Sequence, residues 1–228
     1  MLSKIILLLI LNIISTTKSS DITAAVFGNV LDGMPAAFGD FNSDELTDVF
    51  VLRKESRVLE VLLASDQEPL LRPANLTCNF KNIISSVVPG DFDGDVFMDI
   101  LVTTLDLESK LTLAYIIWGG PGLSLNCSNE SLPILKMREQ PLAMDYNQDM
   151  IIDLFGSDEN NTRTFWVFNH NRTSPEAIQM RSNRDILQPI RVPHSNAFLD
   201  LNGDYYPDLV VTTDQHFEIW HGSSKGFN

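Results

Sequence analysis

Short apolar runs alternate with polar, aspartate-rich stretches along most of the chain. Four of these runs follow directly after a polar stretch of nine residues. Short runs that are rich in β-branched and aromatic residues and lie next to turn-forming residues predict strands and not helices. We therefore expect each polar stretch to be a loop that leads into a buried strand. The four runs are Val49–Val51, Ile100–Val102, Leu154–Phe155 and Leu209–Val211.

The nine-residue stretches share one pattern, with Asp at positions 1, 5 and 9 and Asp or Asn at position 3. They span residues 40–48, 91–99, 145–153 and 200–208, so their first positions are 51, 54 and 55 residues apart. Repeats of this period with about four short strands each are typical of β-propeller blades. No stretch shows sustained helical periodicity between capping residues. The sequence thus predicts an all-β fold, a β-propeller with about four visible blades in residues 20–228.

The chemistry of these loops is that of a calcium site. Hard cations such as Ca²⁺ take six to eight oxygen ligands, and alternate residues of a tight loop can turn their oxygens toward one centre. Carboxylates this close would repel one another without a cation. Asp and Asn also favour turns, which would explain one copy more simply than four. We expect one structural Ca²⁺ in each of up to four loops. The candidate ligands are Asp40, Asn42, Asp44, Asp48, Asp91, Asp93, Asp95, Asp99, Asp145, Asn147, Asp149, Asp153, Asp200, Asn202, Asp204 and Asp208.

An EF-hand, the best-known calcium loop, does not match these stretches. It requires Gly at position 6, a bidentate Glu at position 12 and a helix on both sides. Position 12 here is Val51, Val102, Gly156 or Val211, and strands are expected after position 9. Each loop is therefore predicted to be a hairpin connection. Position 6 is Glu45, Val96, Met150 or Tyr205.

The loops resemble the FG-GAP repeats of integrin α-subunits and their relatives. Phe38-Gly39 precedes the first loop and Pro89-Gly90 the second, and later strands end in Trp118–Leu123 and Trp220–Phe227. The resemblance implies that each loop joins two strands of a blade and holds Ca²⁺. It also implies that the visible blades are part of a seven-bladed ring. Alternatively, Ile22–Val30 could supply the outer strand of the fourth blade and close a four-bladed ring.

The N-terminus predicts export. Residues 1–19 read as a signal peptide, with Lys4 before the apolar segment Ile5–Ile14 and small residues near the cleavage position. The segment is shorter than the roughly 20 residues of a membrane span. Cys78 and Cys127 fit an oxidising compartment, where they would form one disulfide, although two free buried thiols remain the alternative. Sequons at five sites predict N-glycosylation: Asn75, Asn126, Asn129, Asn160 and Asn171.

A leader, loose repeats and several sequons together are most similar to the T-cell immunomodulatory protein family, also called linkin-type proteins. That resemblance implies a cell-surface adhesion or immunomodulatory role with an extracellular or membrane protein partner. Members are longer and end in a membrane-spanning helix, and no such segment is present in this sequence. We expect a secreted chain as it stands, or a single-pass membrane protein if it is a fragment.

Charge and motifs narrow the remaining classes of function. The net charge is −14, and thirteen aspartates lie in the four loops. The sequence has no basic patch or stripe, so we do not expect nucleic-acid binding. The four histidines are scattered and no hydrolase or phosphate-loop motif is present. We expect neither an enzyme nor a small-molecule substrate. A glycan-binding propeller that uses Trp118, Trp166 or Trp220, and the propeller of an exported hydrolase, are the alternatives.

Overall fold

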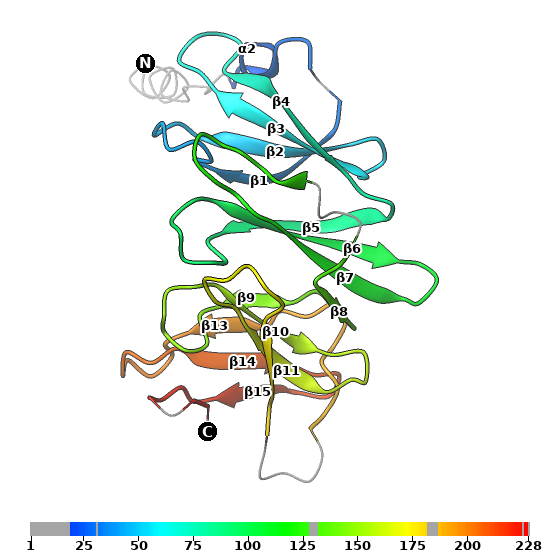
Figure 1. Ribbon diagram of the computed structural model, residues 1–228, viewed down its shortest axis with the longest axis vertical. Coiled ribbons are helices and arrows are strands. Elements are labelled where there is room, and N and C mark those ends of the chain that lie inside the picture. Colours follow the sequence, from blue (N-terminus) through cyan, green and yellow to red (C-terminus); the bar gives the residue numbers. More distant parts are fainter. Residues whose placement is uncertain (1–18, 31, 128–131, 182–186, 225, 228) are drawn as a thin grey trace, which may run out of the picture.

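The computed structural model describes residues 19–30, 32–127, 132–181, 187–224 and 226–227 (Figure 1). Almost all of the predicted signal peptide and the sequon at Asn129 lie outside this part of the chain. None of the helices among the described residues has the length and apolar character needed to cross a membrane.

The described residues form an all-β structure, as the sequence predicts, with four antiparallel sheets in chain order. The first sheet contains β1 (Met34–Gly39), β2 (Asp48–Arg53), β3 (Val58–Ala64) and β4 (Leu71–Asn79). The second contains β5 (Ile83–Gly90), β6 (Asp99–Asp106), β7 (Leu111–Ile117) and β8 (Leu135–Met137). The third contains β9 (Leu142–Met144), β10 (Asp153–Ser157), β11 (Arg163–Val167) and β12 (Glu176–Gln179). The fourth contains β13 (Ala197–Leu199), β14 (Asp208–Thr212) and β15 (Phe217–Trp220).

Successive sheets pack against one another. The first three follow one another along the long axis of the molecule, and the fourth overlaps the third in the view of Figure 1. Side chains alternate between the two faces of a strand, and β6 shows the result. Ile100 and Val102 lie in a cluster with residues of the first sheet, whereas Leu101 between them packs with the third sheet. In β10, Leu154 likewise faces the second sheet and Phe155 the fourth. Central strands are therefore apolar on both faces, which explains their continuous hydrophobic runs.

The segment Ile22–Val30 is not an outer strand of the fourth sheet, so the alternative in which it closes a four-bladed ring in this way is wrong. It contains the short helix α2 (Thr23–Phe27), which lies against the first sheet. Val26 and Phe27 pack on that sheet's outer face beside Val49 and Val51. Both side chains are partly buried there, and removing their apolar surface from water stabilises this position of the segment.

A disulfide and a buried ion pair are among the long-range links that join neighbouring sheets. Cys78 and Cys127 form a disulfide with a Cα–Cα distance of 5.4 Å, which ties β4 to the connection before β8. Cys78 itself lies within β4. Arg163 of β11 makes two bonds to Glu218 of β15, at 2.8 and 3.2 Å, and both side chains are buried. No pattern in the sequence predicts this ion pair.

Candidate cation loops

The four aspartate-rich loops occupy equivalent places in the four sheets. Each joins the first strand of a sheet to the second, and the second strand begins at position 9 of the loop. In Figure 1 all four connections lie along the left side of the molecule. The flanking elements are strands, as the sequence predicts. The strands on both sides of each loop, together with the absence of Glu at position 12, distinguish these loops from an EF-hand.

The carboxylate at position 1 shapes the turn in every loop. Its Oδ2 accepts the amide of position 6 at 2.9–3.0 Å. Position 6 has a φ of 68–70° in all four loops, although none of them has Gly there. A left-handed conformation is costly for a β-branched residue such as Val96. The local bonds to the first aspartate hold it in place. These residues at position 6 are Glu45, Val96, Met150 and Tyr205.

The aspartate at position 9 is fully buried in each loop and connects the loop to the rest of its sheet. Its Oδ2 accepts the amide of position 2, at 2.8–3.0 Å. Its Oδ1 accepts an amide at or just beyond the end of the third strand, at 2.7–2.9 Å. A carboxylate with two such bonds is a strong organiser of the backbone. The donors to Oδ1 are Ala64, Gly119, Phe168 and Gly222.

Burial makes ionisation of three of these aspartates unfavourable. Desolvation raises the pKa of Asp99 and of Asp153 to about 6, and the neighbouring loop carboxylates raise it further against the effect of the two amide bonds. The pKa of Asp48 is raised for the same reasons. At Asp208 desolvation also acts upward, but bonds from Gly222, Leu201 and His221 outweigh it and lower the pKa. A bound cation would offset the repulsion between Asp48, Asp99 or Asp153 and the other carboxylates of its loop.

The donor set of the second loop fits a hard cation. Carboxylate oxygens of Asp91, Asp93 and Asp99 lie within 4.8 Å of one another, and Asp99 and Asp93 are buried. All side-chain donors of the four loops are oxygens or amides, which suits Ca²⁺ and not Zn²⁺. In the other three loops position 3 is Asn, whose Oδ1 accepts the amide of position 5. Those loops share the backbone of the second but have one fewer carboxylate at the candidate ligand positions.

The histidines do not form a common site. His170 contacts the backbone oxygen of Asp93 at 2.7 Å, and His194 contacts that of Gln140 at 2.6 Å. His221 lies 3.3 Å from Asp208, and His216 lies 3.6 Å from Glu218. These four contacts fall in different parts of the fold, so the described histidines offer no shared acid–base pair.

Four of the five sequon asparagines can be placed, and all four are exposed. Their exposure leaves room for a glycan at each site, and glycosylation itself stays a prediction. They are Asn75, Asn126, Asn160 and Asn171.

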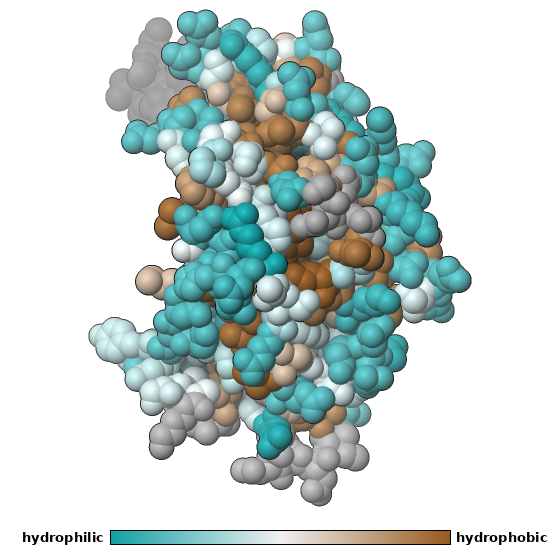
Figure 2. All heavy atoms as spheres, viewed as in Figure 1, coloured by the Kyte–Doolittle hydropathy of each residue, from teal (hydrophilic) through white to brown (hydrophobic). Residues whose placement is uncertain are grey.

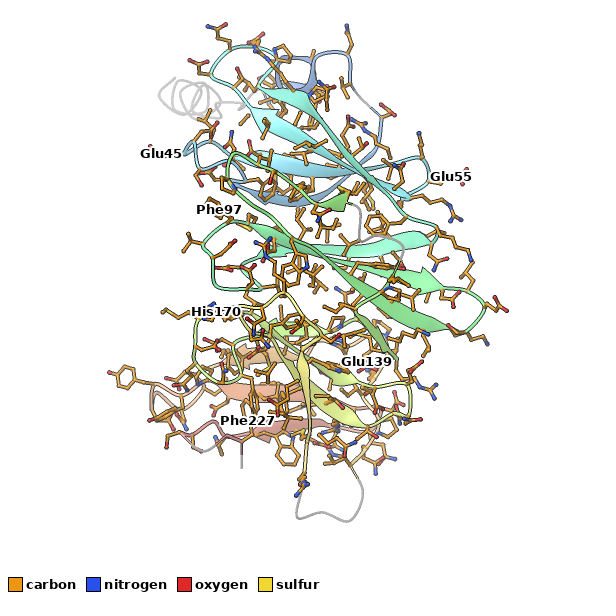
Figure 3. The ribbon with its side chains drawn as sticks, in the orientation of Figure 1. Glu45, Glu55, Phe97, Glu139, His170 and Phe227 are labelled. Carbon is orange, nitrogen blue, oxygen red and sulfur yellow. A yellow bond between two sulfur atoms is a disulfide. The ribbon has the colours of Figure 1, made fainter. Side chains whose placement is uncertain are left out.

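Sequence reasoning missed the partners that reach the second loop from the third sheet. Arg172, in the connection between β11 and β12, bonds the side chains of Asp93 and Asp95. His170 of the same connection contacts the same loop (Figure 3). The one available signal was compositional: of the four loops, only the second has a carboxylate at position 3, and a buried carboxylate there needs a counter-charge.

The fold and loops define an all-β protein built from repeated antiparallel sheets, each with an acidic hairpin connection. The chain is similar to proteins named T-cell immunomodulatory protein. It is 36% identical over 218 residues to the human protein and 35% identical over 216 residues to the rat protein, which in both cases covers 91% of this chain and 34% of the relative. Protein linkin of Caenorhabditis elegans is 25% identical over 201 residues, 80% of this chain and 32% of linkin. No family model matches the chain.

These similarities support a relationship to the T-cell immunomodulatory and linkin proteins over nearly the whole chain. The chain spans about a third of the length of these relatives.

Proposed function

We propose that this chain is an extracellular recognition module of the T-cell immunomodulatory protein family that binds a protein partner at the cell surface. The observation that carries the proposal is the sequence similarity to the human and rat proteins over 91% of the chain. The name of those relatives suggests an immunomodulatory role here. Because the chain spans a third of their length, the activity of the longer proteins is itself part of the proposal.

We further propose that the four sheets are blades of an FG-GAP β-propeller whose loops bind structural Ca²⁺. Support comes from the equivalent place of each loop in its sheet and from the oxygen cluster of Asp91, Asp93 and Asp99. An ion in such a loop would balance the charge of carboxylates whose pKa burial raises, such as Asp99 and Asp153. It would bind only the folded state and so stabilise it. The role of the ions is structural in this proposal, and the module is not an enzyme.

A glycan-binding role is less well supported. It would need aromatic side chains that a sugar can reach, but Trp118 and Trp166 are buried in the core between the second and third sheets. Trp220 is partly buried and packs against the core between the third and fourth sheets. Exposed sequons favour passage through the secretory pathway, as expected of an extracellular module.

Thermal unfolding of the chain secreted from animal cells tests the calcium role. With Ca²⁺ at a hundred times its dissociation constant, we expect the unfolding temperature to be higher than in EDTA by roughly 5–10 °C for each loop that binds an ion. Replacing the first aspartate of all four loops by Asn keeps the turn-forming side chain but removes four charges. This variant should lose most of the difference between Ca²⁺ and EDTA. The substitutions are Asp40→Asn, Asp91→Asn, Asp145→Asn and Asp200→Asn.

A binding assay tests the recognition role. The purified chain, labelled with a fluorophore, should bind to the surface of T cells in Ca²⁺ and bind less after EDTA treatment. The variant with four Asn substitutions is the matched control. Equal binding of the unfolded chain, or no binding by a folded and Ca²⁺-loaded chain, would contradict a recognition role for this part of the protein.

A further inference from the structure

Arg172 crosses from the third sheet to the second loop. Its Nε bonds Asp93 Oδ2, and one terminal nitrogen bonds Asp95 Oδ2 at 2.6 Å and the Gly119 carbonyl at 3.2 Å. The guanidinium carbon also lies 5.6 Å from the centre of the Trp118 ring. Although 40% of the Arg172 side chain is exposed, only 2% of Asp93 is. The pair is therefore more than a surface ion pair, because Asp93 is removed from water.

Arg172 takes the place of a donor that the other loops contain within themselves. In those loops the side-chain amide of Asn at position 3 donates to Oδ2 of Asp at position 5, at 2.8–2.9 Å. Asp93 cannot donate, and Arg172 supplies the bond to Asp95 Oδ2 instead. Arg172 also offsets part of the charge of the second loop. With four carboxylates and one guanidinium its net charge is −3, which equals that of the third and fourth loops, whereas the first loop, with Glu45 and three aspartates, has −4.

Other residues of the connection between β11 and β12, and Phe168 just before it, also contact the second loop. His170 Nδ1 lies 2.7 Å from the Asp93 carbonyl, and its ring fills the space beside Gly94. A Cβ atom at Gly94 would lie 2.6 Å from His170 Cε1, so this approach requires glycine. Phe92 of the loop packs edge to face with Phe168 at 5.6 Å between ring centroids. Polar, steric and apolar contacts thus converge on the same junction.

We propose that Arg172 is a latch that holds the third sheet on the second loop, and that a divalent cation and Arg172 compete for the oxygens of Asp93 and Asp95. The main role of Asp93 in this proposal is to bind Arg172, and its role as a cation ligand is secondary. The second loop becomes the one of the four at which cation binding and inter-sheet docking are coupled. The competition rests on the proposed calcium role, whereas the latch does not.

A double-mutant cycle in EDTA tests the latch without any cation. Arg172→Gln leaves Asp93 buried without its counter-charge, and we expect the unfolding temperature to fall by about 4–8 °C. In the Asp93→Asn background the loop has the amide donor of the other three, so Arg172→Gln should have a much smaller effect. Strictly additive effects of the two substitutions would overturn the latch. Arg53→Gln is the control, because Arg53 pairs with Glu60 and Asp32 away from all four loops.

The Ca²⁺ concentration that gives half of the rise in unfolding temperature tests the competition. Arg172→Gln should lower this concentration by about tenfold for the part of the rise that comes from the second loop. A tenfold change corresponds to about 1.4 kcal/mol in the free energy of Ca²⁺ binding. Arg53→Gln should leave the concentration unchanged. An unchanged or raised concentration in Arg172→Gln overturns the competition. If neither the unsubstituted chain nor Arg172→Gln responds to Ca²⁺, the competition and the calcium role both fail, and the cycle in EDTA still decides the latch.

Discussion

Glu139 is a buried carboxylate that no feature of the sequence marks. It lies between β8 and β9, and its side chain accepts the amide of Ser157 at 2.5 Å (Figure 3). Desolvation raises its pKa above the ordinary 4.5, although bonds from Ser157 and the charges of His194 and Arg138 act in the opposite direction. The folded chain therefore binds a proton at Glu139 more tightly than the unfolded chain does.

Stability should depend on pH through this group. Its contribution is fully present below the unfolded pKa near 4.5 and is lost as the pH rises through the higher folded pKa. Glu139→Gln keeps an acceptor for Ser157 and cannot ionise. We expect it to raise the unfolding temperature at pH 7 and to leave it nearly unchanged at pH 4, measured by calorimetry in EDTA. The exposed Glu176→Gln is the control. A lower unfolding temperature for Glu139→Gln at pH 7 would refute the argument.

At the scale of elements, the chain repeats one hairpin and joins the copies by links that differ. The aspartates at positions 1 and 9 recur with the same bonds in every sheet, because the bonds to position 1 and the first bond to position 9 close within nine residues. The links between sheets do not repeat. A disulfide joins the first and second sheets, Arg172 the second and third, and the Arg163–Glu218 pair the third and fourth.

The disulfide should contribute a large part of the stability of the first two sheets. It closes a loop with a sequence separation of 49 residues. The chain-entropy relation gives about 4 kcal/mol for such a loop, which corresponds to a fall of roughly 10 °C in the unfolding temperature when Cys78 and Cys127 are both replaced by Ala. Differential scanning calorimetry measures the change, and the reduced unsubstituted chain is the control. Two titratable thiols in the native unreduced chain would show that the bond is absent.

At the scale of the whole molecule, the outer faces of the first and last sheets differ. Helix α2 covers part of the first. On the fourth sheet, Leu209 and Val211 face the third sheet, whereas Phe217, Ile219 and Leu199 are 70%, 47% and 43% exposed. Apolar side chains exposed on an outer sheet face mark a contact region or an aggregation hazard. The apolar band in Figure 2 is separate from these residues: it runs along the middle of the view, mainly above the fourth sheet, with hydrophilic residues on both sides.

We expect the chain to associate through the outer face of the fourth sheet at high concentration. Phe217→Ser with Ile219→Thr should reduce the association seen by light scattering during size-exclusion chromatography. The unfolding temperature should change little, because both side chains are already exposed. Phe38→Ser removes a single exposed aromatic from β1 and serves as the control. If Phe38→Ser abolished association and the double substitution did not, the face of the fourth sheet would be excluded.

The sequence by itself determined the strands that follow the loops, the repeat of about four units and the local turn chemistry. Hydrophobic periodicity and the bonds of an aspartate to amides a few residues away are properties of short segments. Only the tertiary structure decided that Ile22–Val30 forms a helix on the first sheet, that Cys78 meets Cys127, and that Arg172 serves a loop 77 residues earlier. The physical reason is that these contacts depend on how whole sheets pack, and packing is set by the burial of both faces of every strand together.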